Sequence, residues 1–273
     1  MMKMWALGTG SRGNAVLFES EGSRVLIDAG FALRDLEARL GAIGVPAESI
    51  EDLVVTHEHA DHVRGACAAA RRWGWTLHAT AGTLTACPEL ADAGAVAIAP
   101  DRTLLLDTIC VDAVPVSHDA AEPVAVVVTA RGSGIRAAVV YDLGQGGPAL
   151  RRALERLDML VLEANHDDGM LRAGPYPPSV RSRIGGRLGH LSNRAAADLA
   201  RGCAHRGLSH IVLAHLSDRC NQPGLAAAAV GAALSHTPFR GGLHGAPQEI
   251  VVGPFRPMAR SEARAAQLSL GLS

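Results

Sequence analysis

Short runs of apolar, often β-branched residues alternate along this chain with Ala-rich and Leu-rich stretches whose apolar positions recur at helical spacing. The short runs predict β-strands at residues 15–20, 24–30, 52–56, 109–117, 124–130, 135–142, 158–164, 210–215 and 249–254. The periodic stretches predict helices at residues 32–43, 63–73, 82–92, 148–156, 193–206 and 223–235. Such interleaving of strands and helices predicts a layered α/β fold.

The pattern continues without a linker-like change in composition, although 273 residues would be enough for one large domain or two small ones. We therefore expect a single domain over residues 1–255. Residues 256–273 are expected to form a peripheral C-terminal tail, either as a docked helix or in part disordered.

Composition narrows the class of protein. Hydrophobic residues make up 48% of the chain and aromatic residues only 3%, so Ala, Val and Leu must fill the core. Five cysteines without CxxC spacing favour a reducing cytosol over a disulfide framework. No apolar run is long enough for a signal peptide or a membrane span, so we expect a soluble, cytoplasmic protein with no membrane partner. The sequence carries no signal for the oligomeric state.

Residues that commonly bind metals follow four of the predicted strands. His57 follows "LVVT", His118 follows "VDAVPVS", Asp142 follows "AAVVY", and His215 follows "IVLA". In α/β proteins, strand ends at one edge of a sheet are where sites are assembled. We therefore expect these four side chains to meet.

The first of these positions opens the motif "HEHADH" at residues 57–62. On an extended segment, His57 and His59 would project to the same side, and Asp61 and His62 follow on the turn into the next helix. A single histidine at a strand end is more often structural than a ligand, but three histidines and an aspartate at this spacing favour a metal. The set expected for one ion is His57, His59 and His118. The set expected for a second ion is Asp61, His62 and His215, with Asp142 bridging both.

Imidazole and carboxylate ligands without a thiolate suit Zn²⁺, Mn²⁺ or Fe²⁺, and we expect two divalent ions, Zn²⁺ or Mn²⁺, as cofactors. Two ions about 3.5–4 Å apart would hold a bridging hydroxide as nucleophile and neutralise charge on an attacked phosphoryl or carbonyl group.

The motif "THEHADH", with His118, Asp142 and His215 behind it, resembles the metallo-β-lactamase superfamily. The resemblance implies an αββα sandwich of two similar halves, with two mixed β-sheets flanked by helices. It also implies that Asp28 in "VLIDAG" supports the metal-binding loop without touching metal.

A closer resemblance, to the YycJ/WalJ-type hydrolases, covers nearly the whole chain. It is carried in order by "GTGSRGNA" (8–15), "LIDAGF" (26–31), "VTHEHADHVRG" (55–65), "LEANHDDGML" (162–171), "YP" (176–177), "GHLSN" (189–193) and "VLAHLS" (212–217). Members of that family are described as double-stranded DNA exonucleases of 5′-to-3′ polarity. One departure is Cys220 before Asn221, where the family tends to carry two asparagines.

Local charge bears on the substrate class, because the superfamily hydrolyses lactams, thioesters, lactones and phosphodiesters. The formal net charge of −1 gives no global basic signature for nucleic-acid binding. Residues 169–197, however, contain no Asp or Glu and five arginines, namely Arg172, Arg181, Arg183, Arg187 and Arg194. We interpret this Arg-rich loop as an anion-binding surface, with an ordinary solvated loop as the alternative. The substrate contacts expected from it are Arg181, Arg183 and Arg187.

The motif "GHLSN" lies directly before the helix predicted at 193–206. Ser192 or Asn193 could cap this helix, and a helix N-terminus also attracts anions. The motif resembles the "GHST" element of ribonuclease Z. That resemblance implies that His190 contacts the scissile phosphate or protonates the leaving oxygen, oriented by Glu163. The residues expected to act in catalysis are Asp61, His190 and Glu163. Further expected substrate contacts are Ser192, Asn193, Asn165 and His166.

Two other features of the sequence bear on the predicted substrate. Asp142 follows His118 by only 24 positions, too few for the tRNA-holding arm of ribonuclease Z. The glycine-rich stretch 8–14 could approach a phosphate through its backbone N–H groups or could simply form a tight turn.

The sequence thus favours a dinuclear metal-dependent phosphodiesterase acting on nucleic acid, with DNA cleaved from a 5′ end as the first expectation and RNA still open. The enzyme alternative is a glyoxalase-type thioester or lactone hydrolase. The alternative from another class is a noncatalytic nucleic-acid-binding relic.

Overall fold

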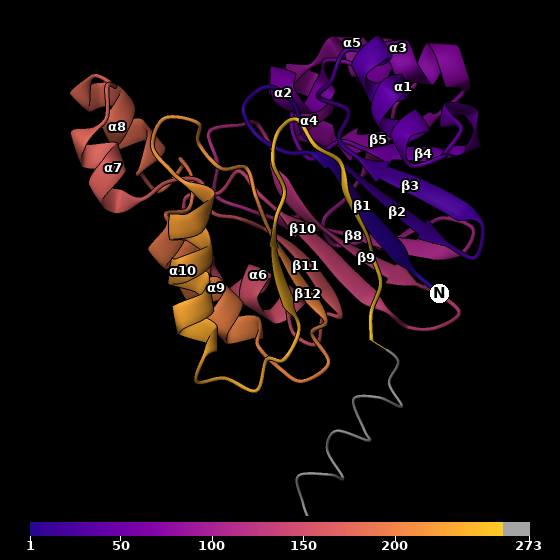
Figure 1. The fold of residues 1–273 in the computed structure, drawn as a ribbon. Helices are drawn as coiled ribbons and strands as arrows, with labels where there is room; N and C mark the ends of the chain where they lie inside the picture. The colour runs from indigo at the N-terminus through magenta and orange to yellow at the C-terminus, as the bar shows by residue number, and fades with distance from the viewer. Residues whose placement is uncertain (259–273) are drawn as a thin grey trace, which may run out of the picture.

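The computed structural model describes residues 1–258 and contains two seven-stranded β-sheets packed against each other (Figure 1). The first sheet has the order β14-β1-β2-β3-β4-β5-β6, formed by β1 (Lys3–Gly8), β2 (Ala15–Ser20), β3 (Ser23–Ile27), β4 (Asp52–Val54), β5 (Thr76–Thr80), β6 (Val96–Ile98) and β14 (Val252–Phe255). The second sheet has the order β13-β12-β11-β10-β9-β8-β7, formed by β7 (Leu104–Leu105), β8 (Ile109–Pro115), β9 (Val124–Ala130), β10 (Arg136–Val140), β11 (Met159–Glu163), β12 (His210–Ala214) and β13 (Gly242–Gly245).

Each sheet is mixed in the same way. In the first, β14, β1, β2 and β3 pair antiparallel, whereas β3, β4, β5 and β6 pair parallel. In the second, β7, β8, β9 and β10 pair antiparallel, whereas β10, β11, β12 and β13 pair parallel. Strands β8, β10, β11 and β12 therefore run in one direction and end at one edge of their sheet.

Helices cover the outer face of both sheets. They are α1 (Leu33–Ala42), the 3₁₀ turn η1 (Ala47–Ser49), α2 (Ala60–Val63), α3 (Ala66–Trp73), α4 (Ala81–Ala86), α5 (Pro88–Asp92), α6 (Pro148–Ala153), α7 (Asp168–Ala173), α8 (Pro178–Ile184), α9 (Asn193–Cys203) and α10 (Pro223–Leu234). In Figure 1, α1, α3 and α5 lie over the first sheet, and α6, α9 and α10 lie over the second. This arrangement confirms the predicted αββα sandwich.

Strand β9 illustrates why the central strands read as unbroken apolar runs. Val124, Val126 and Val128 are buried in the core between the two sheets. Ala125 and Val127, which point the other way, are buried against the helices of the second sheet. Because both faces of the strand are covered, residues 124–128 are all apolar and the alternation of a half-exposed strand is absent.

Two helices predicted as continuous are each divided in the structure. The helix expected at 63–73 is broken at Gly65, whose N–H donates to the Ala29 carbonyl oxygen at 2.8 Å and not to the preceding helical turn. The helix expected at 82–92 is divided before Pro88, which begins α5 at a position where its missing N–H is not needed.

The Arg-rich segment 169–197 is not the loop that the sequence predicted, because it contains α7, α8 and the start of α9. Asp167 caps α7 by accepting hydrogen bonds from the N–H groups of Gly169 and Met170, both at 2.9 Å. Pro178 begins α8. In Figure 1, α7 and α8 project together from one side of the sandwich.

The end of the described chain packs along the sheets. Phe255 pairs with Met4 between β14 and β1, and the Met258 N–H donates to Ser209 Oγ at 2.8 Å. The remainder of the predicted C-terminal tail, residues 259–273, lies outside the described residues. Within residues 1–258, no helix is both long enough and apolar enough to cross a membrane.

Candidate metal centre and active site

The residues around the site follow the ends of strands from both sheets, and three of them have a left-handed backbone. Asp28 follows β3 with φ of 60°, Asp142 follows β10 with φ of 55°, and His215 follows β12 with φ of 53°. Such angles are uncommon for residues other than glycine, although Asp and His tolerate them better than most. Conformations of this kind cluster at functional sites.

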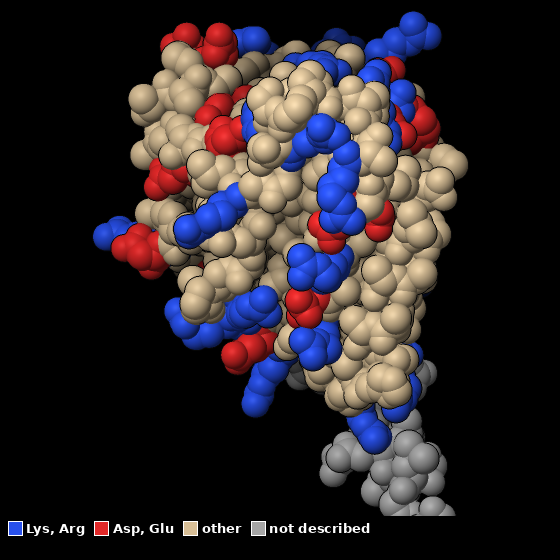
Figure 2. Space-filling view, turned by 90° about the vertical axis from the view of Figure 1, so that its left-hand side faces the viewer, with Lys and Arg blue, Asp and Glu red and all other residues tan. Residues whose placement is uncertain are grey.

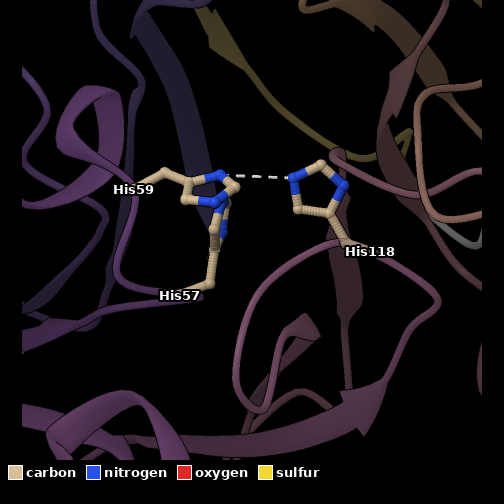
Figure 3. Close-up of side chains that lie close together, drawn as sticks. All are labelled: His57, His59 and His118. Atoms are coloured by element: carbon tan, nitrogen blue, oxygen red, sulfur yellow. Dashed lines mark hydrogen bonds between the residues drawn. The ribbon is translucent and has the colours of Figure 1, made fainter. Parts of the chain in front are cut away.

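The first predicted ligand set comes together in the structure. Side-chain nitrogens of His57, His59 and His118 lie within 4.8 Å of one another. Figure 3 shows His57 and His59 on one loop facing His118 from another, with 3.3 Å between His59 Nδ1 and His118 Nε2. The other nitrogen of His118, Nδ1, lies 3.1 Å from the carbonyl oxygen of Gly189, which fixes the orientation of the ring.

The second predicted set also converges. Ligand atoms of Asp61, His62 and His215 lie within 4.8 Å of one another. Asp61 Oδ2 is 3.5 Å from the Nε2 atoms of both histidines. The three side chains therefore surround a common point.

Asp142 lies between the two sets, as expected of a bridging ligand. Its Oδ2 is 2.7 Å from His62 Nε2 and 4.0 Å from His57 Nε2, and its Oδ1 is 3.3 Å from His215 Nδ1. It is the carboxylate that approaches both clusters.

The side chains present suit divalent cations. His57 Nε2 and His215 Nε2 are buried without a hydrogen-bond partner among the described residues, which is unusual for buried polar atoms and normal for metal ligands. Burial lowers the pKa of His62, but the carboxylates of Asp28 and Asp142 outweigh it and raise the pKa well above its ordinary value. Likewise, burial lowers the pKa of His215, but Asp142, Asp61 and Glu163 raise it to about 9. These carboxylates create a negative potential that favours cations.

Asp28 is fully buried behind the ligands and supports His62. Its Oδ2 lies 2.8 Å from His62 Nδ1 and accepts hydrogen bonds from the Thr56 hydroxyl at 2.8 Å and the Tyr141 hydroxyl at 2.6 Å. Its Oδ1 accepts from the Thr56 N–H at 2.8 Å. These contacts match the supporting role that the superfamily resemblance implies.

Glu163, the last residue of β11, holds two histidines. Its Oε1 lies 2.8 Å from His190 Nδ1 and 3.1 Å from His215 Nδ1. Burial raises its pKa, but His190 and His215 outweigh that effect and lower the pKa to about 2. Sequence reasoning assigned Glu163 to His190 alone and missed its contact with His215.

A cavity of about 230 Å³ opens at this centre. Its lining includes Asp61, Asp142, His59, His118, His190 and His215 from the candidate site. Val180, Arg183 and Ile184 of α8 line it as well, together with Ser11 from the glycine-rich loop. The projecting helix α8 therefore forms part of the wall.

The prediction that all five arginines of residues 169–197 lack acidic partners is wrong for two of them. Arg183 Nε lies 2.6 Å from Asp119 Oδ2, and Arg194 Nε lies 3.5 Å from Asp168 Oδ2. Asp119 is distant in sequence and could not be counted with the segment, whereas Asp168 directly precedes it and was left out by the choice of residue 169 as the start.

The other arginines leave a mixed surface. Arg172 and Arg187 are exposed, and Arg181 is half-buried and donates to the Arg172 carbonyl oxygen. Figure 2 views the side of the molecule that carries α7 and α8 and shows Lys and Arg side chains spread over it, with Asp and Glu between them. The face offers guanidinium groups to an anion without being uniformly basic.

Several expected substrate contacts have other partners in the structure. Ser192 caps α9 by accepting from the Ala195 N–H at 3.2 Å. Asn193 is buried and exchanges two hydrogen bonds of 2.9 Å with Asn221. Asn165 is buried and donates to the His215 carbonyl oxygen at 2.9 Å. The cavity lining does not include these residues or His166, which is buried.

Sequence reasoning also missed two residues that hold the site together. The Asn14 side-chain amide lies 3.2 Å from Asp61 Oδ2 and 3.1 Å from His62 Nε2. Asn221 ties the loop after His215 to the start of α9 through Asn193. The signal in the sequence was that Asn14 lies inside one motif of the family resemblance and Asn221 lies shortly after another.

Known proteins are similar to this chain in sequence. Residues 8–158 match the family described as the metallo-beta-lactamase superfamily. The chain is 31% identical over 241 residues to exodeoxyribonuclease YycJ of Bacillus anthracis, covering 85% of this chain and 89% of that protein. It is 30% identical over 221 residues to exodeoxyribonuclease WalJ of Streptococcus pneumoniae, covering 79% and 81% of the two chains.

Solved structures share the fold at lower sequence identity. YhfI, a metallo-beta-lactamase fold protein of Bacillus subtilis, superposes with a TM-score of 0.70 at 18% identity, covering 92% of this chain and 98% of its own. The short form of human tRNase Z superposes with a TM-score of 0.63 at 17% identity, covering 94% of this chain and 100% of its own. At such identities the similarity concerns the fold alone.

Proposed function

Because this chain belongs to the metallo-β-lactamase superfamily and is a YycJ/WalJ-like metal-dependent hydrolase, we propose that it degrades double-stranded DNA from the 5′ end. The names of the relatives support DNA as the substrate and removal of terminal nucleotides as the reaction. A DNA substrate also agrees with the cytoplasmic location that the cysteine pattern predicts. The observation that carries the proposal is the His190–Glu163 pair, which lies beside seven convergent metal-ligand candidates, five of which line one cavity.

Two divalent ions fit the ligand sets. One would be held by His57, His59 and His118, the other by Asp61, His62 and His215, with Asp142 shared. Bound there, Zn²⁺ or Mn²⁺ would supply an activated water nucleophile and neutralise charge on the attacked phosphate. Asp61 is a ligand candidate and also lines the cavity, so we include it among the catalytic residues.

His190 is the proposed proton donor. Burial lowers its pKa, but the carboxylates of Glu163 and Asp142 outweigh burial and raise the pKa well above its ordinary value. The two carboxylates therefore favour the protonated form of the ring. With Nδ1 held by Glu163, the Nε2–H remains to contact the scissile phosphate and protonate the leaving oxygen.

Helix α8 would hold the strand that is being cut. Arg183 reaches the cavity wall from this helix, and its guanidinium lies against Asp119 at 2.6 Å. Guanidinium groups suit phosphate oxygens because their N–H groups form a planar fork. Arg181 and Arg187 lie on the same projection and would contact phosphates farther along the strand.

The proposal is tested with duplex DNA, single-stranded DNA and RNA, each labelled separately at the 5′ or the 3′ end. Protein loaded with Mn²⁺ or Zn²⁺ should release labelled mononucleotides early from 5′-labelled duplex DNA and late from the 3′-labelled duplex. Cleavage of RNA alone, or the opposite order of release, would contradict the substrate or the polarity. Hydrolysis of a glutathione thioester without nuclease activity would support the glyoxalase-type alternative, and loss of both activities the relic.

The number of ions is tested by elemental analysis of the same preparations. Wild-type protein should contain two ions per chain. His118→Ala should lose mainly one of them, because the second set keeps all of its ligands. His236→Ala, which changes an exposed histidine outside the site, is the matched control and should retain both. One ion or none in fully loaded wild-type protein would contradict the dinuclear centre.

A further inference from the structure

The glycine-rich loop at residues 8–14 is tied at both ends to ligands of the second metal set. At one end, Thr9 Oγ1 accepts a hydrogen bond from the His215 N–H at 3.1 Å. At the other, the Asn14 N–H donates to the Asp61 carbonyl oxygen at 2.8 Å, and the Asn14 amide lies 3.2 Å from Asp61 Oδ2. The loop therefore has a fixed position relative to the candidate metal centre.

The middle of the loop is held by one side chain. Gln248 accepts a hydrogen bond from the Arg12 N–H at 2.9 Å and donates to the Gly13 carbonyl oxygen at 2.8 Å. Gly10 has φ of +144°, and a Cβ there would lie 2.6 Å from the side-chain oxygen of Gln248. The positive φ favours glycine at this position, and the contact with Gln248 shows how closely its side chain packs on the loop.

Three backbone N–H groups of the loop are not available to bind a phosphate. The N–H of Gly10 donates to the Asn14 side chain, that of Arg12 to Gln248, and that of Gly13 to the Gly10 carbonyl oxygen. The alternative left open by the sequence, a phosphate cradle made of backbone N–H groups, therefore loses these donors to internal partners. Of the residues of the loop, Ser11 is the one that lines the cavity, and it is exposed.

We propose that the Ser11 hydroxyl donates a hydrogen bond to a phosphate oxygen of the bound strand and so helps to select phosphodiester substrates. This inference rests on the proposed function, because it takes the substrate to be a nucleic-acid strand. The loop places a small, uncharged donor at the cavity, where Arg183 and His190 approach from other elements. Since the loop is already rigid, little conformational entropy is lost when Ser11 forms the contact.

The experiment compares Ser11→Ala, Ser11→Thr and the control Ser133→Ala in metal-loaded protein. Ser133 is exposed in the turn between β9 and β10 and does not line the cavity. The substrates are 5′-phosphorylated duplex DNA and the small diester bis(p-nitrophenyl) phosphate. A hydrogen bond to a charged group corresponds to a factor of about 10 in binding. Ser11→Ala should therefore raise KM about 10-fold on both substrates with little change in kcat, whereas Ser11→Thr, which keeps the hydroxyl, and Ser133→Ala should resemble wild type.

The two proposals fail in different ways. If wild type hydrolyses the small diester but no nucleic acid, the proposed function is wrong, and the KM of Ser11→Ala on the diester still tests the contact. An unchanged KM on every substrate that wild type hydrolyses would overturn the role of Ser11. So would a lower metal content in Ser11→Ala, because it would show that the residue shapes the metal centre and not the substrate site.

Discussion

Asp28 offers the sharpest test of how the fold supports the metal centre. Its two oxygens accept from the Thr56 N–H, the Thr56 hydroxyl and the Tyr141 hydroxyl and contact His62 Nδ1, all within 2.8 Å. In Asp28→Asn, one oxygen becomes an NH₂ group of nearly the same size. Whichever way the amide lies, this NH₂ faces a group that donated to the carboxylate, so at least one buried donor loses its acceptor.

The size of the effect follows from these contacts. One buried donor without an acceptor lowers the free energy of unfolding by about 1–3 kcal/mol. The substitution also removes the negative charge beside His62, which orients the ring and increases its basicity as a ligand. Loss of such a partner typically weakens metal binding 10–100-fold, equivalent to about 1.4–2.8 kcal/mol.

A second His–Asp pair in the same sheet provides a matched control. His78 Nε2 lies 2.7 Å from Asp52 Oδ1, with no role in the candidate metal clusters. We expect both Asp28→Asn and Asp52→Asn to lower the melting temperature of metal-free protein, but only Asp28→Asn to weaken Zn²⁺ binding in a chelator-competition titration. Equal affinity in Asp28→Asn and wild type, or equal weakening in the two variants, would refute the reasoning.

Three further outcomes are expected. His190→Ala should retain both ions yet slow single-turnover cleavage by about 10²–10⁴-fold, and near-normal cleavage by this variant would exclude the proton-donor role. Glu163→Gln should also lose metal, because Glu163 contacts the ligand His215. Arg187→Ala should lower the slope of log affinity against log salt by about 1, whereas Arg194→Ala, whose guanidinium has a carboxylate partner, should change it less. Burial lowers the pKa of His215, but neighbouring carboxylates outweigh it and raise the pKa from 6.5 to about 9 in metal-free protein. Protonated His215 therefore stabilises the fold fully below pH 6.5, and this stabilisation is lost as the pH rises through 9. The free energy of unfolding in urea should fall over this window, and a flat profile would contradict the raised pKa.

The ligand positions could be predicted from the sequence because they depend on a local rule. Each of His57, His118, Asp142 and His215 follows an apolar run. These runs become strands β4 of the first sheet and β8, β10 and β12 of the second, whose ends meet. The structure required only that the two sheets face each other for the four side chains to converge. Of the strands missed from the sequence, β5 is interrupted by His78, whereas β1 carries an apolar run from Met4 to Leu7 that was not recognised as a strand.

Contacts between distant segments could not be predicted in this way. Asp119 and Arg183 are 64 positions apart, and their pairing depends on how α8 folds back over the cavity. The local cap of Asp167 and the proline that starts α8 were visible in the sequence, but the charge pattern suggested a loop. The composition of the Arg-rich segment therefore suggested a more basic surface than the segment has once its acidic neighbours are included.

The left-handed backbone at Asp28, Asp142 and His215 shows how the fold and the site depend on each other. For a residue other than glycine, this conformation is unfavourable by about 1–2 kcal/mol. It occurs where the chain has left each strand, at the residue whose own side chain enters the site or supports it. Buried strands behind each residue and hydrogen bonds such as Asn165 to the His215 carbonyl oxygen hold the strained geometry. Glycine would relieve the strain at any of the three positions but would remove a ligand or the support of a ligand. At these positions the metal centre is therefore kept at the cost of a lower free energy of unfolding.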